Sequence, residues 1–310
     1  MKSVMKQLVP VLISSMILFS FSSCNAPEKE KAKDENAFSF AFLTDIHVQP
    51  EKNADQGLLQ AIDTVNKLNP DFVITGGDQI MDALGQTEAR ADSLYDMYIE
   101  LSGSFNMPVY NTMGNHEVFG IYARSGVDPS NPLYGEKMFE ERIGPRYYAF
   151  DHKGWRFYIL DSVDEVEDGG AYYGHIDSTQ IEWLKEDLKN VDPGTPIAIS
   201  VHIPFITVQT QLVYGSTAAN SEGLVITNAT DVLSLFLEHN LKLVLQGHLH
   251  FLEDIYVGGI HFITGGAVSA SWWNGPRGEM EEGFLLVNVN GEDIDWEYVD
   301  FGWEAVANED

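Results

Sequence analysis

Apolar and polar positions in the first third of the chain predict strands and helices in alternation. Residues 38–43, 72–74 and 107–110 are short apolar runs with the length of buried strands, whereas 54–68 and 87–101 space their apolar residues at a helical period. Since helical stretches separate the apolar runs, the pattern predicts parallel strands joined by right-handed crossovers.

The pattern changes after residue 147, where short β runs become frequent. We expect a hairpin at residues 147–160, a helix at Ser178–Leu188 with Ser178 as its N-cap, and a hairpin turn at Asn290-Gly291. The other predicted elements are a helix at 231–238 and strands at 196–201, 241–245, 254–257, 260–264, 284–289 and 294–299. This pattern favours one α/β domain with two sheets; the alternative is a separate β domain in the second half.

Polar side chains follow five of the predicted strands, at the point where each strand ends. The five segments are Asp45-x-His47, Gly77-Asp78, Gly114-Asn115-His116-Glu117, His202 and Gly247-His248-x-His250. In a parallel sheet the carboxyl ends of the strands meet at one edge, where ligands bind. Polar groups buried there cost stability unless a site uses them. Each segment alone is also explained as a loop, but together they predict one shared site.

Carboxylate, amide and imidazole groups are all present in these segments. This donor set suits Mn²⁺, Fe²⁺ or Zn²⁺ better than Ca²⁺ or Mg²⁺. Seven such ligands are too many for one ion and fit two ions that share a bridging carboxylate.

In this order, the five segments resemble the signature of the calcineurin-like metallophosphoesterases, and the resemblance extends from about residue 38 to 303. It implies an α/β fold of four layers, α/β/β/α, in which two mixed sheets are flanked by helices. It also implies two divalent cations and a phosphate ester as the substrate. The implied metal ligands are Asp45, His47 and His250 for the first ion, Asp78 as the bridge, and Asn115, His202 and His248 for the second.

The resemblance further implies that a metal-bridging hydroxide attacks phosphorus while His116 assists the leaving group. In many relatives an Asp three residues after the bridging Asp holds this imidazole, but here that position is Met81. We therefore expect Asp82 to be the partner of His116; the alternative is that Asp82 is an acid at a helix N-terminus. His47 and Met81 also depart from the purple acid phosphatase pattern, which has Gly and Tyr at these positions.

Candidate substrate-binding residues come from two loops. Arg124 follows the His116 segment, and Trp272, Trp273 and Asn274 lie in a Gly- and Pro-containing loop late in the chain. Adjacent Trp side chains could stack on a base or a sugar. The alternative is that a Trp covers the edge of the sheet.

The chain is strongly acidic, which bears on its partners. It has 18 Lys and Arg against 47 Asp and Glu, a formal net charge of −29. Such a charge repels nucleic acid, so the DNA nucleases of the family are disfavoured. The predicted function is a phosphodiesterase, with the cyclic-nucleotide type as one candidate, or a phosphomonoesterase. The alternative is a non-catalytic binding lipoprotein that retains the fold.

The first residues resemble a bacterial lipoprotein signal. Two lysines precede an apolar stretch that ends in small residues before Cys24, the one cysteine of the sequence. We expect a signal peptide at 1–23, lipidation of Cys24, a charged tether at 24–37 and a catalytic domain at 38–310. The protein would then be exported and anchored in a bacterial membrane, on the periplasmic or outer-membrane face. The alternative is an ordinary cleaved signal.

Overall fold

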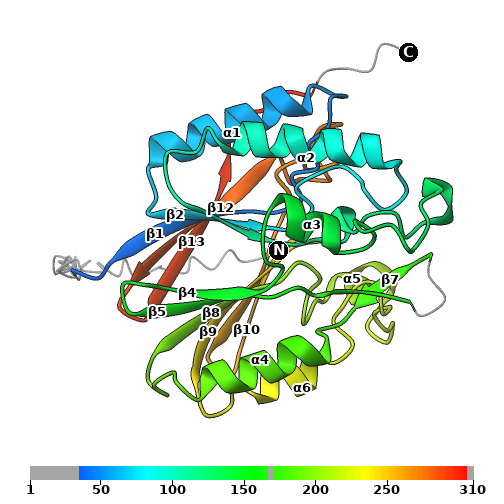
Figure 1. Cartoon of the computed structure of the whole chain (residues 1–310). Coiled ribbons are helices and arrows are strands. Elements are labelled where there is room, and N and C mark those ends of the chain that lie inside the picture. Colours follow the sequence, from blue (N-terminus) through cyan, green and yellow to red (C-terminus); the bar gives the residue numbers. More distant parts are fainter. Residues whose placement is uncertain (1–34, 167–169, 306–310) are drawn as a thin grey trace, which may run out of the picture. The chain divides into compact units, whose positions relative to one another are not determined.

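Two β-sheets packed face to face form the centre of the fold (Figure 1). The computed structural model describes residues 35–166 and 170–305, within a compact unit of residues 34–310. The first sheet has the order β13–β12–β1–β2–β3, with bounds Asp293–Asp300, Gly283–Asn290, Phe38–Leu43, Phe72–Gly76 and Val109–Thr112. The second has the order β10–β11–β9–β8–β5–β4, with bounds Leu252–Val257, Ile260–Gly265, Asn240–Gln246, Pro196–Ser200, Trp155–Ile159 and Tyr148–His152.

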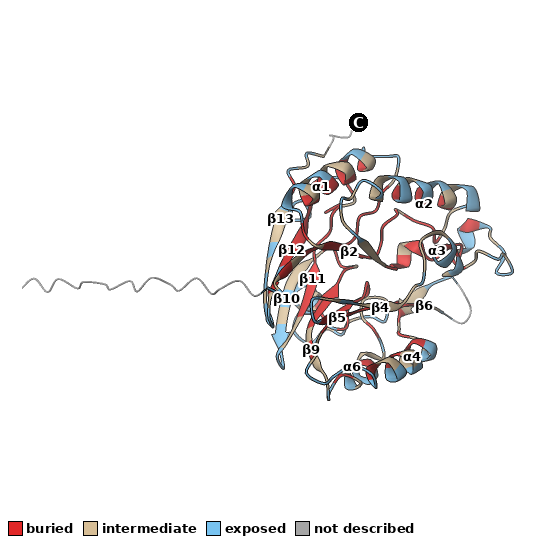
Figure 2. Cartoon of the chain, turned by 60° about the vertical axis from the view of Figure 1, so that its left-hand side comes forward, coloured by how far each residue is buried: buried red, intermediate tan, exposed pale blue. Residues whose placement is uncertain are grey.

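Helices cover the outer face of each sheet. The helices α1 (Ala54–Leu68) and α2 (Glu88–Ser102) lie over the first sheet, and α4 (Ser178–Leu188) and α6 (Ala229–Ser234) lie over the second (Figures 1 and 2). Short elements complete the structure: α3 (Lys137–Arg142), α5 (Gln209–Tyr214), the 3-10 turns η1 (Asn115–Glu117) and η2 (Ala123–Ser125), and the pair β6 (Val163–Glu165) and β7 (Tyr172–Gly174). The predicted four-layer α/β/β/α sandwich is confirmed.

The interface between the sheets is packed with aromatic side chains. Phe40 and Phe72 stack with ring centroids 5.1 Å apart, and Phe157 of the second sheet contacts Phe72 edge-on at 5.3 Å. All three are at most 1% exposed, and Figure 2 shows central strands such as β11 and β12 as largely buried, whereas the edge strands β10 and β13 are partly exposed. Burying such rings provides much of the stability of a domain and makes the two sheets a rigid support.

The carboxyl ends of the central strands point to one edge of the sandwich. β1, β2 and β3 are parallel neighbours in the first sheet, and β5, β8, β9 and β11 are parallel neighbours in the second. The polar segments found in the sequence directly follow these strands, so the sheets bring them together as predicted.

Two predictions about the second half can now be judged. β12 pairs with β1, so strands from the first and the last third of the chain share the first sheet. The hairpin between β12 and β13 at Asn290-Gly291 is confirmed. The N-cap of α4 is Asp177 rather than Ser178, because the Asp177 carboxylate accepts hydrogen bonds from the backbone N–H groups of Thr179 and Gln180.

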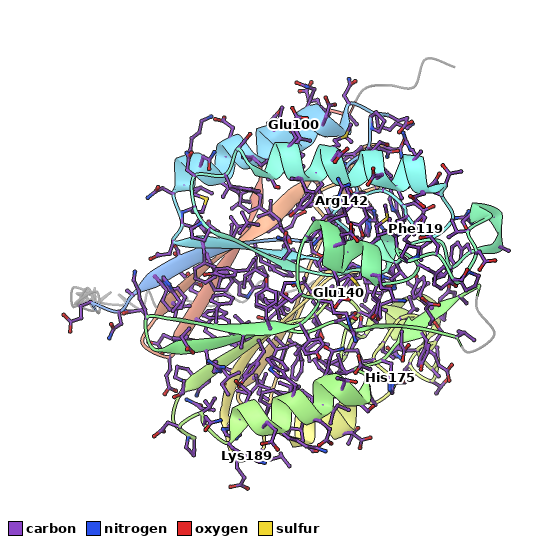
Figure 3. All side chains as sticks on the ribbon, viewed as in Figure 1. Glu100, Phe119, Glu140, Arg142, His175 and Lys189 are labelled. Atoms are coloured by element: carbon purple, nitrogen blue, oxygen red, sulfur yellow. The ribbon has the colours of Figure 1, made fainter. Side chains whose placement is uncertain are left out.

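Side-chain ion pairs join the short α3 to α2. Arg142 of α3 pairs with Asp92 and Asp96 of α2 (Figure 3).

The predicted signal peptide, Cys24 and most of the predicted tether lie outside the described residues. Among the helices that the structure does describe, none combines the length and the apolar character that a membrane span requires.

Candidate metal centre

Strained backbone turns present most of the predicted ligands. Asp45, His47, Asp78, His248 and His250 have φ of 54°, 50°, 52°, 72° and 45°, in the left-handed region that residues other than glycine avoid. Each such conformation costs about 1–3 kcal/mol and persists only where the surrounding structure enforces it. Here the backbone N–H groups of Asp45 and His47 donate to the carbonyls of Gly77 and Asp78 at 3.0 and 2.9 Å.

Two glycines make room for the ligands. Gly77 has φ of 92°, and a Cβ at that position would collide with the His202 ring. A Cβ at Gly114 would collide with the backbone nitrogen and the carboxylate of Asp78. The glycines before Asp78 and Asn115 are therefore required by close approach across the site, and not only by turn formation.

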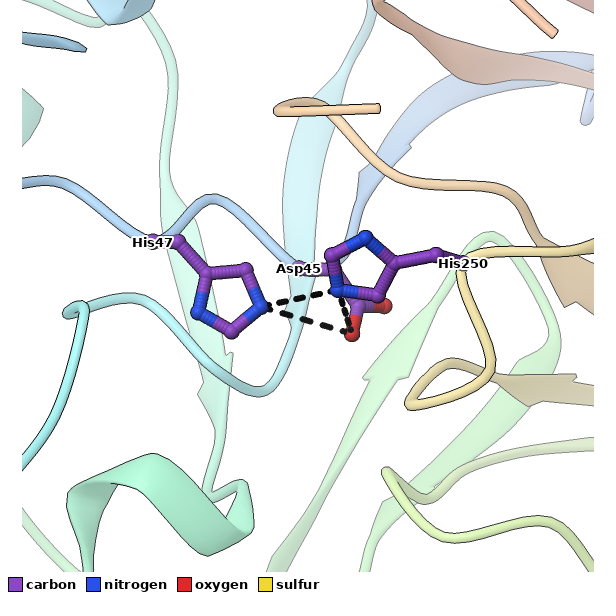
Figure 4. Close-up of side chains that lie close together, drawn as sticks. All are labelled: Asp45, His47 and His250. Atoms are coloured by element: carbon purple, nitrogen blue, oxygen red, sulfur yellow. Dashed lines mark hydrogen bonds and ion pairs between the residues drawn. The ribbon is translucent and has the colours of Figure 1, made fainter. Parts of the chain in front are cut away.

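One group of ligands contains Asp45, His47 and His250 (Figure 4). The Nε2 atoms of His47 and His250 lie 2.9 Å apart, and they lie 3.9 and 3.3 Å from Asp45 Oδ1. These three side chains are between 0% and 4% exposed. Two ring nitrogens and a carboxylate oxygen therefore converge on one buried point.

A second group contains Asp78, His202 and His248. His202 Nε2 lies 3.1 Å from Asp78 Oδ2 and 3.1 Å from Asn115 Oδ1. Asp78 Oδ2 is also 3.7 Å from His47 Nε2, so this carboxylate lies between the two groups. The structure thus brings all seven predicted ligands together.

Backbone carbonyls orient three of the imidazoles. His202 Nδ1 donates to the carbonyl of Gly76 at 2.8 Å, His250 Nδ1 to that of Ala270 at 2.5 Å, and His248 Nε2 to that of Gly223 at 2.9 Å. Each such bond orients the ring and leaves its other nitrogen for a metal, as is usual for metal-ligating histidines.

The charges in the site also suit metal ligands. Burial opposes ionisation of Asp45, but the nearby His250 imidazole lowers the pKa of that carboxyl to about 2. Burial acts against a charge on His202 as well, yet the Asp78 carboxylate raises the pKa of that imidazole to about 9, so without a metal this ring holds a proton that a bound cation would displace. Burial and His202 together lower the pKa of His248 to about 4. Ionised Asp45 and neutral His248 are the forms that bind metals.

These residues fit two metal ions. Asp45 Oδ1, one of the three converging atoms, is buried without a hydrogen-bond partner among the described residues, which is costly for a polar atom in a protein interior. Separations of about 3–4 Å are those expected between atoms that ligate one ion at about 2 Å. Asp45, His47 and His250 would hold one ion, and Asn115, His202 and His248 the other, with Asp78 between them.

The profile of the family described as Calcineurin-like phosphoesterase matches residues 38–252. This chain belongs to that family. The match includes all five polar segments.

Several known proteins are similar to this chain. A 3',5'-cyclic-nucleotide phosphodiesterase of Nostoc sp. is 26% identical over 223 residues, which cover 68% of this chain and 71% of that protein. Purple acid phosphatase 3 of Arabidopsis thaliana is 22% identical over 316 residues, which cover 93% and 82%. Among solved structures, a dimetal phosphatase of Danio rerio has a TM-score of 0.60 at 15% identity and covers 86% and 96% of the two chains. The last likeness concerns the fold alone.

Glu117 has a role that the sequence analysis did not assign. Its buried carboxylate accepts hydrogen bonds from the backbone N–H groups of Asp78, Ile80 and Gly114 at 2.9, 3.1 and 2.8 Å. These bonds hold the loop that carries Asp78. The signal was present in the sequence, because Glu117 closes the Gly114-Asn115-His116-Glu117 segment.

His116 lies beside the centre on its more open side. Its ring is 4.6 Å from that of His47, its Nε2 is 3.8 Å from Asp78 Oδ2, and its side chain is 21% exposed. Its Nδ1 contacts the carbonyl of Met81. The Asp82 carboxylate instead accepts from the backbone N–H of Leu84 at 2.9 Å.

The expectation that Asp82 holds His116 is therefore corrected: the Met81 carbonyl occupies that position. Asp82 also accepts a hydrogen bond from Gln86 and pairs with Arg124 at 3.3 Å. Arg124 lies over the Tyr122 ring at 4.7 Å and is well exposed, so it remains a candidate for substrate contact.

The two tryptophans of the late loop have different environments. Trp273 is only 1% exposed, so the prediction that it contacts the substrate is wrong. Its Nε1 instead donates to the carbonyls of Ile46 and His47 and supports the His47 turn. Trp272 is partly exposed, with its indole 4.4 Å from the His250 ring. Asn274 is exposed, and its amide donates to the carbonyls of Ser271 and Trp272.

Proposed function

We propose that this protein hydrolyses phosphodiesters at a centre of two divalent cations. One observation carries this proposal: the seven predicted ligands converge on two adjoining buried points. His116, which is not among these ligands, lies beside them. Membership in a phosphoesterase family and the similarity to a cyclic-nucleotide phosphodiesterase support it. A phosphomonoesterase is the second candidate, supported by the similarity to a purple acid phosphatase.

The bound cations would supply an activated water and would neutralise charge on the phosphoryl group. The donor set of imidazole, carboxylate and amide oxygen suits Mn²⁺, Fe²⁺ or Zn²⁺. Asp78, through its position between the two groups of ligands, would set the spacing of the two ions. Glu117 would keep Asp78 in place through three backbone hydrogen bonds.

His116 would act on the leaving group. Its Nδ1 lies against the Met81 carbonyl, which accepts a hydrogen bond and favours a proton on that nitrogen. In the imidazolium form Nε2 carries the second proton, and it would donate this proton to the departing alkoxide oxygen while the neutral ring keeps its proton on Nδ1. We place the enzyme outside the cytoplasm as a lipoprotein anchored through Cys24, on the strength of the N-terminal sequence.

The first experiment combines a metal count with a substrate comparison. The protein is purified without chelator, its metals are measured by elemental analysis, and Mn²⁺-dependent hydrolysis of bis-p-nitrophenyl phosphate is compared with that of p-nitrophenyl phosphate. We expect about two metals per chain and faster hydrolysis of the diester.

The other outcomes are equally informative. Faster hydrolysis of the monoester would favour the phosphomonoesterase. If the protein binds no metal and turns over neither compound after reconstitution with Mn²⁺, Fe²⁺ and Zn²⁺, a non-catalytic binding protein would describe this chain better than an enzyme.

A further inference from the structure

A cavity of about 440 Å³ begins at the metal-ligand candidate His250. It extends between β10, β13 and the turn that precedes β12. Phe251, Met280 and Tyr298 form apolar parts of its wall. We call this cavity the His250 pocket. His250 both lines this pocket and is a candidate metal ligand. When the phosphoryl group of a substrate binds at the metal centre, its ester substituent would therefore lie close to the His250 pocket.

The charges in the wall of the His250 pocket are mostly negative. Glu279, Glu281 and Asp300 contribute carboxylates, whereas Arg277 contributes the one guanidinium among the lining side chains. The Arg277 guanidinium lies 5.2 Å from the centre of the Trp272 ring, on which it is positioned for a cation–π interaction. Three acidic residues and one basic residue therefore line the pocket.

The wall is held in place by hydrogen bonds. The backbones of Arg277 and Met280 pair in both directions, at 2.9 and 3.3 Å. The Tyr298 hydroxyl donates to the carbonyl of Glu281 at 2.7 Å. Asp300 Oδ1 accepts from the backbone N–H of Gly302 at 2.6 Å. The carboxylates thus project from a fixed turn and a strand end rather than from a free loop.

The same loop also shapes the metal centre. The carbonyl of Ala270 accepts the Nδ1–H of His250, and the Trp272 indole lies against the His250 ring. Ala270 and Trp272 have φ of 42° and 52°. Backbone strain of this kind is typical of sites where function dictates the conformation. The His250 pocket and the ligand His250 are therefore parts of one structure.

We propose that the His250 pocket holds the ester substituent of the substrate and selects substituents that carry no negative charge. The inference rests on the proposed function and specifies its substrate class: phosphodiesters of neutral or cationic alcohols, rather than esters with a second anionic group. A charge near several carboxylates at a partly solvated site changes affinity by about tenfold, which corresponds to about 1.4 kcal/mol.

Three phosphodiesters with the same p-nitrophenyl leaving group test this selection. Their second substituents are choline, its uncharged isostere 3,3-dimethylbutyl, and 3-carboxy-3-methylbutyl, so that size is similar while charge changes from positive to negative. We expect kcat/KM for the anionic ester to be about tenfold below that for the neutral ester, and the choline ester to equal or exceed the neutral one.

A double variant, Glu279→Lys with Glu281→Lys, should reduce or invert this order. The matched control is Glu182→Lys with Glu186→Lys on α4, which changes the net charge equally at two exposed glutamates and should leave the order intact. Two results would overturn this inference and leave the proposed function intact. One is equal kcat/KM for the three esters, and the other is an order of kcat/KM values that the pocket variant does not change. Failure to hydrolyse any of the three esters after metal reconstitution would overturn the proposed function and this inference with it.

Discussion

Two clusters of charged side chains in the described part of the molecule obtain their charge balance in different ways. In the cluster around Arg146, the guanidinium lies 2.7 Å from carboxylate oxygens of both Asp161 and Asp177 and 3.0 Å from Glu136 Oε2. In the metal centre, Asp45 and Asp78 are surrounded by imidazoles and by no Lys or Arg within ion-pair distance among the described residues. The first cluster contains its own cation, and the second fits cations from solution.

The backbones of the two clusters differ as well. Arg146, Glu136, Asp161 and Asp177 all have ordinary negative φ, whereas five of the seven metal-ligand candidates have positive φ. A buried carboxylate is stable only with a partner, and both clusters meet that requirement. Only the metal centre adds backbone strain to it, and strain of this kind is typical of functional sites rather than of structural ion pairs.

Removing the carboxylate shared by both groups of ligands should have the largest effect. Asp78→Asn takes away the charge between the two metal positions, so we expect turnover to fall by at least about a thousandfold and bound metal to decrease. Elemental analysis, steady-state kinetics and circular dichroism measure activity, metal content and fold together. Asp63→Asn, at an exposed aspartate of α1, is the matched control and should have no effect. Full activity in Asp78→Asn would contradict the ligand assignment.

Removing the cation of the Arg146 cluster should affect stability instead. Arg146→Met leaves Asp161, which is 0% exposed, without its basic partner. We expect the free energy of unfolding to decrease by about 3 kcal/mol, measured by urea denaturation, while metal content stays the same. The comparison variant is Arg90→Met, which breaks the surface pair with Glu51 and should cost less than about 1 kcal/mol. Equal losses in the two variants would show that the Arg146 cluster is not a special stabilising feature.

The sequence predicted the metal centre better than the Arg146 cluster, and the reason is topological. The ligands follow strands whose carboxyl ends meet at one edge, so short segments such as Asp45-x-His47 already imply their neighbours in space. Arg146 and Asp177 are 31 residues apart and belong to no such pattern. Contacts of that kind depend on how elements pack, which hydrophobic periodicity does not specify.

Within the site, the errors also have physical causes. The partner of His116 is the backbone carbonyl of Met81, and a carbonyl gives no side-chain signal, so the neighbouring Asp82 was the only candidate visible in the sequence. Of the adjacent Trp272 and Trp273, the second is buried against the His47 turn. Both residues have positive φ, so strand alternation does not tell which indole points inward.

The smallest effect is expected from a carboxylate of the Arg146 cluster that binds a proton at neutral pH. Burial and the neighbouring Asp161 raise the pKa of Glu136 well above its ordinary value of 4.5, near which the group ionises in the unfolded chain. Between the unfolded-state and the folded-state pKa the folded protein holds one more proton than the unfolded chain, so the contribution of this group to stability decreases as pH rises.

Glu136→Gln removes this proton uptake and keeps a side-chain amide that can donate to Asp161. We therefore expect the variant to be more stable than the wild type by about 1 kcal/mol at pH 8, with little difference near pH 4.5, as measured by urea denaturation across that range. Glu140→Gln on α3 (Figure 3) is the control, because its carboxylate is half exposed and 3.9 Å from Arg146 Nε. If the free energy of unfolding changes with pH in the same way for the wild type and Glu136→Gln, Glu136 is ionised in the folded protein. The Arg146 cluster would then carry one more negative charge than we infer.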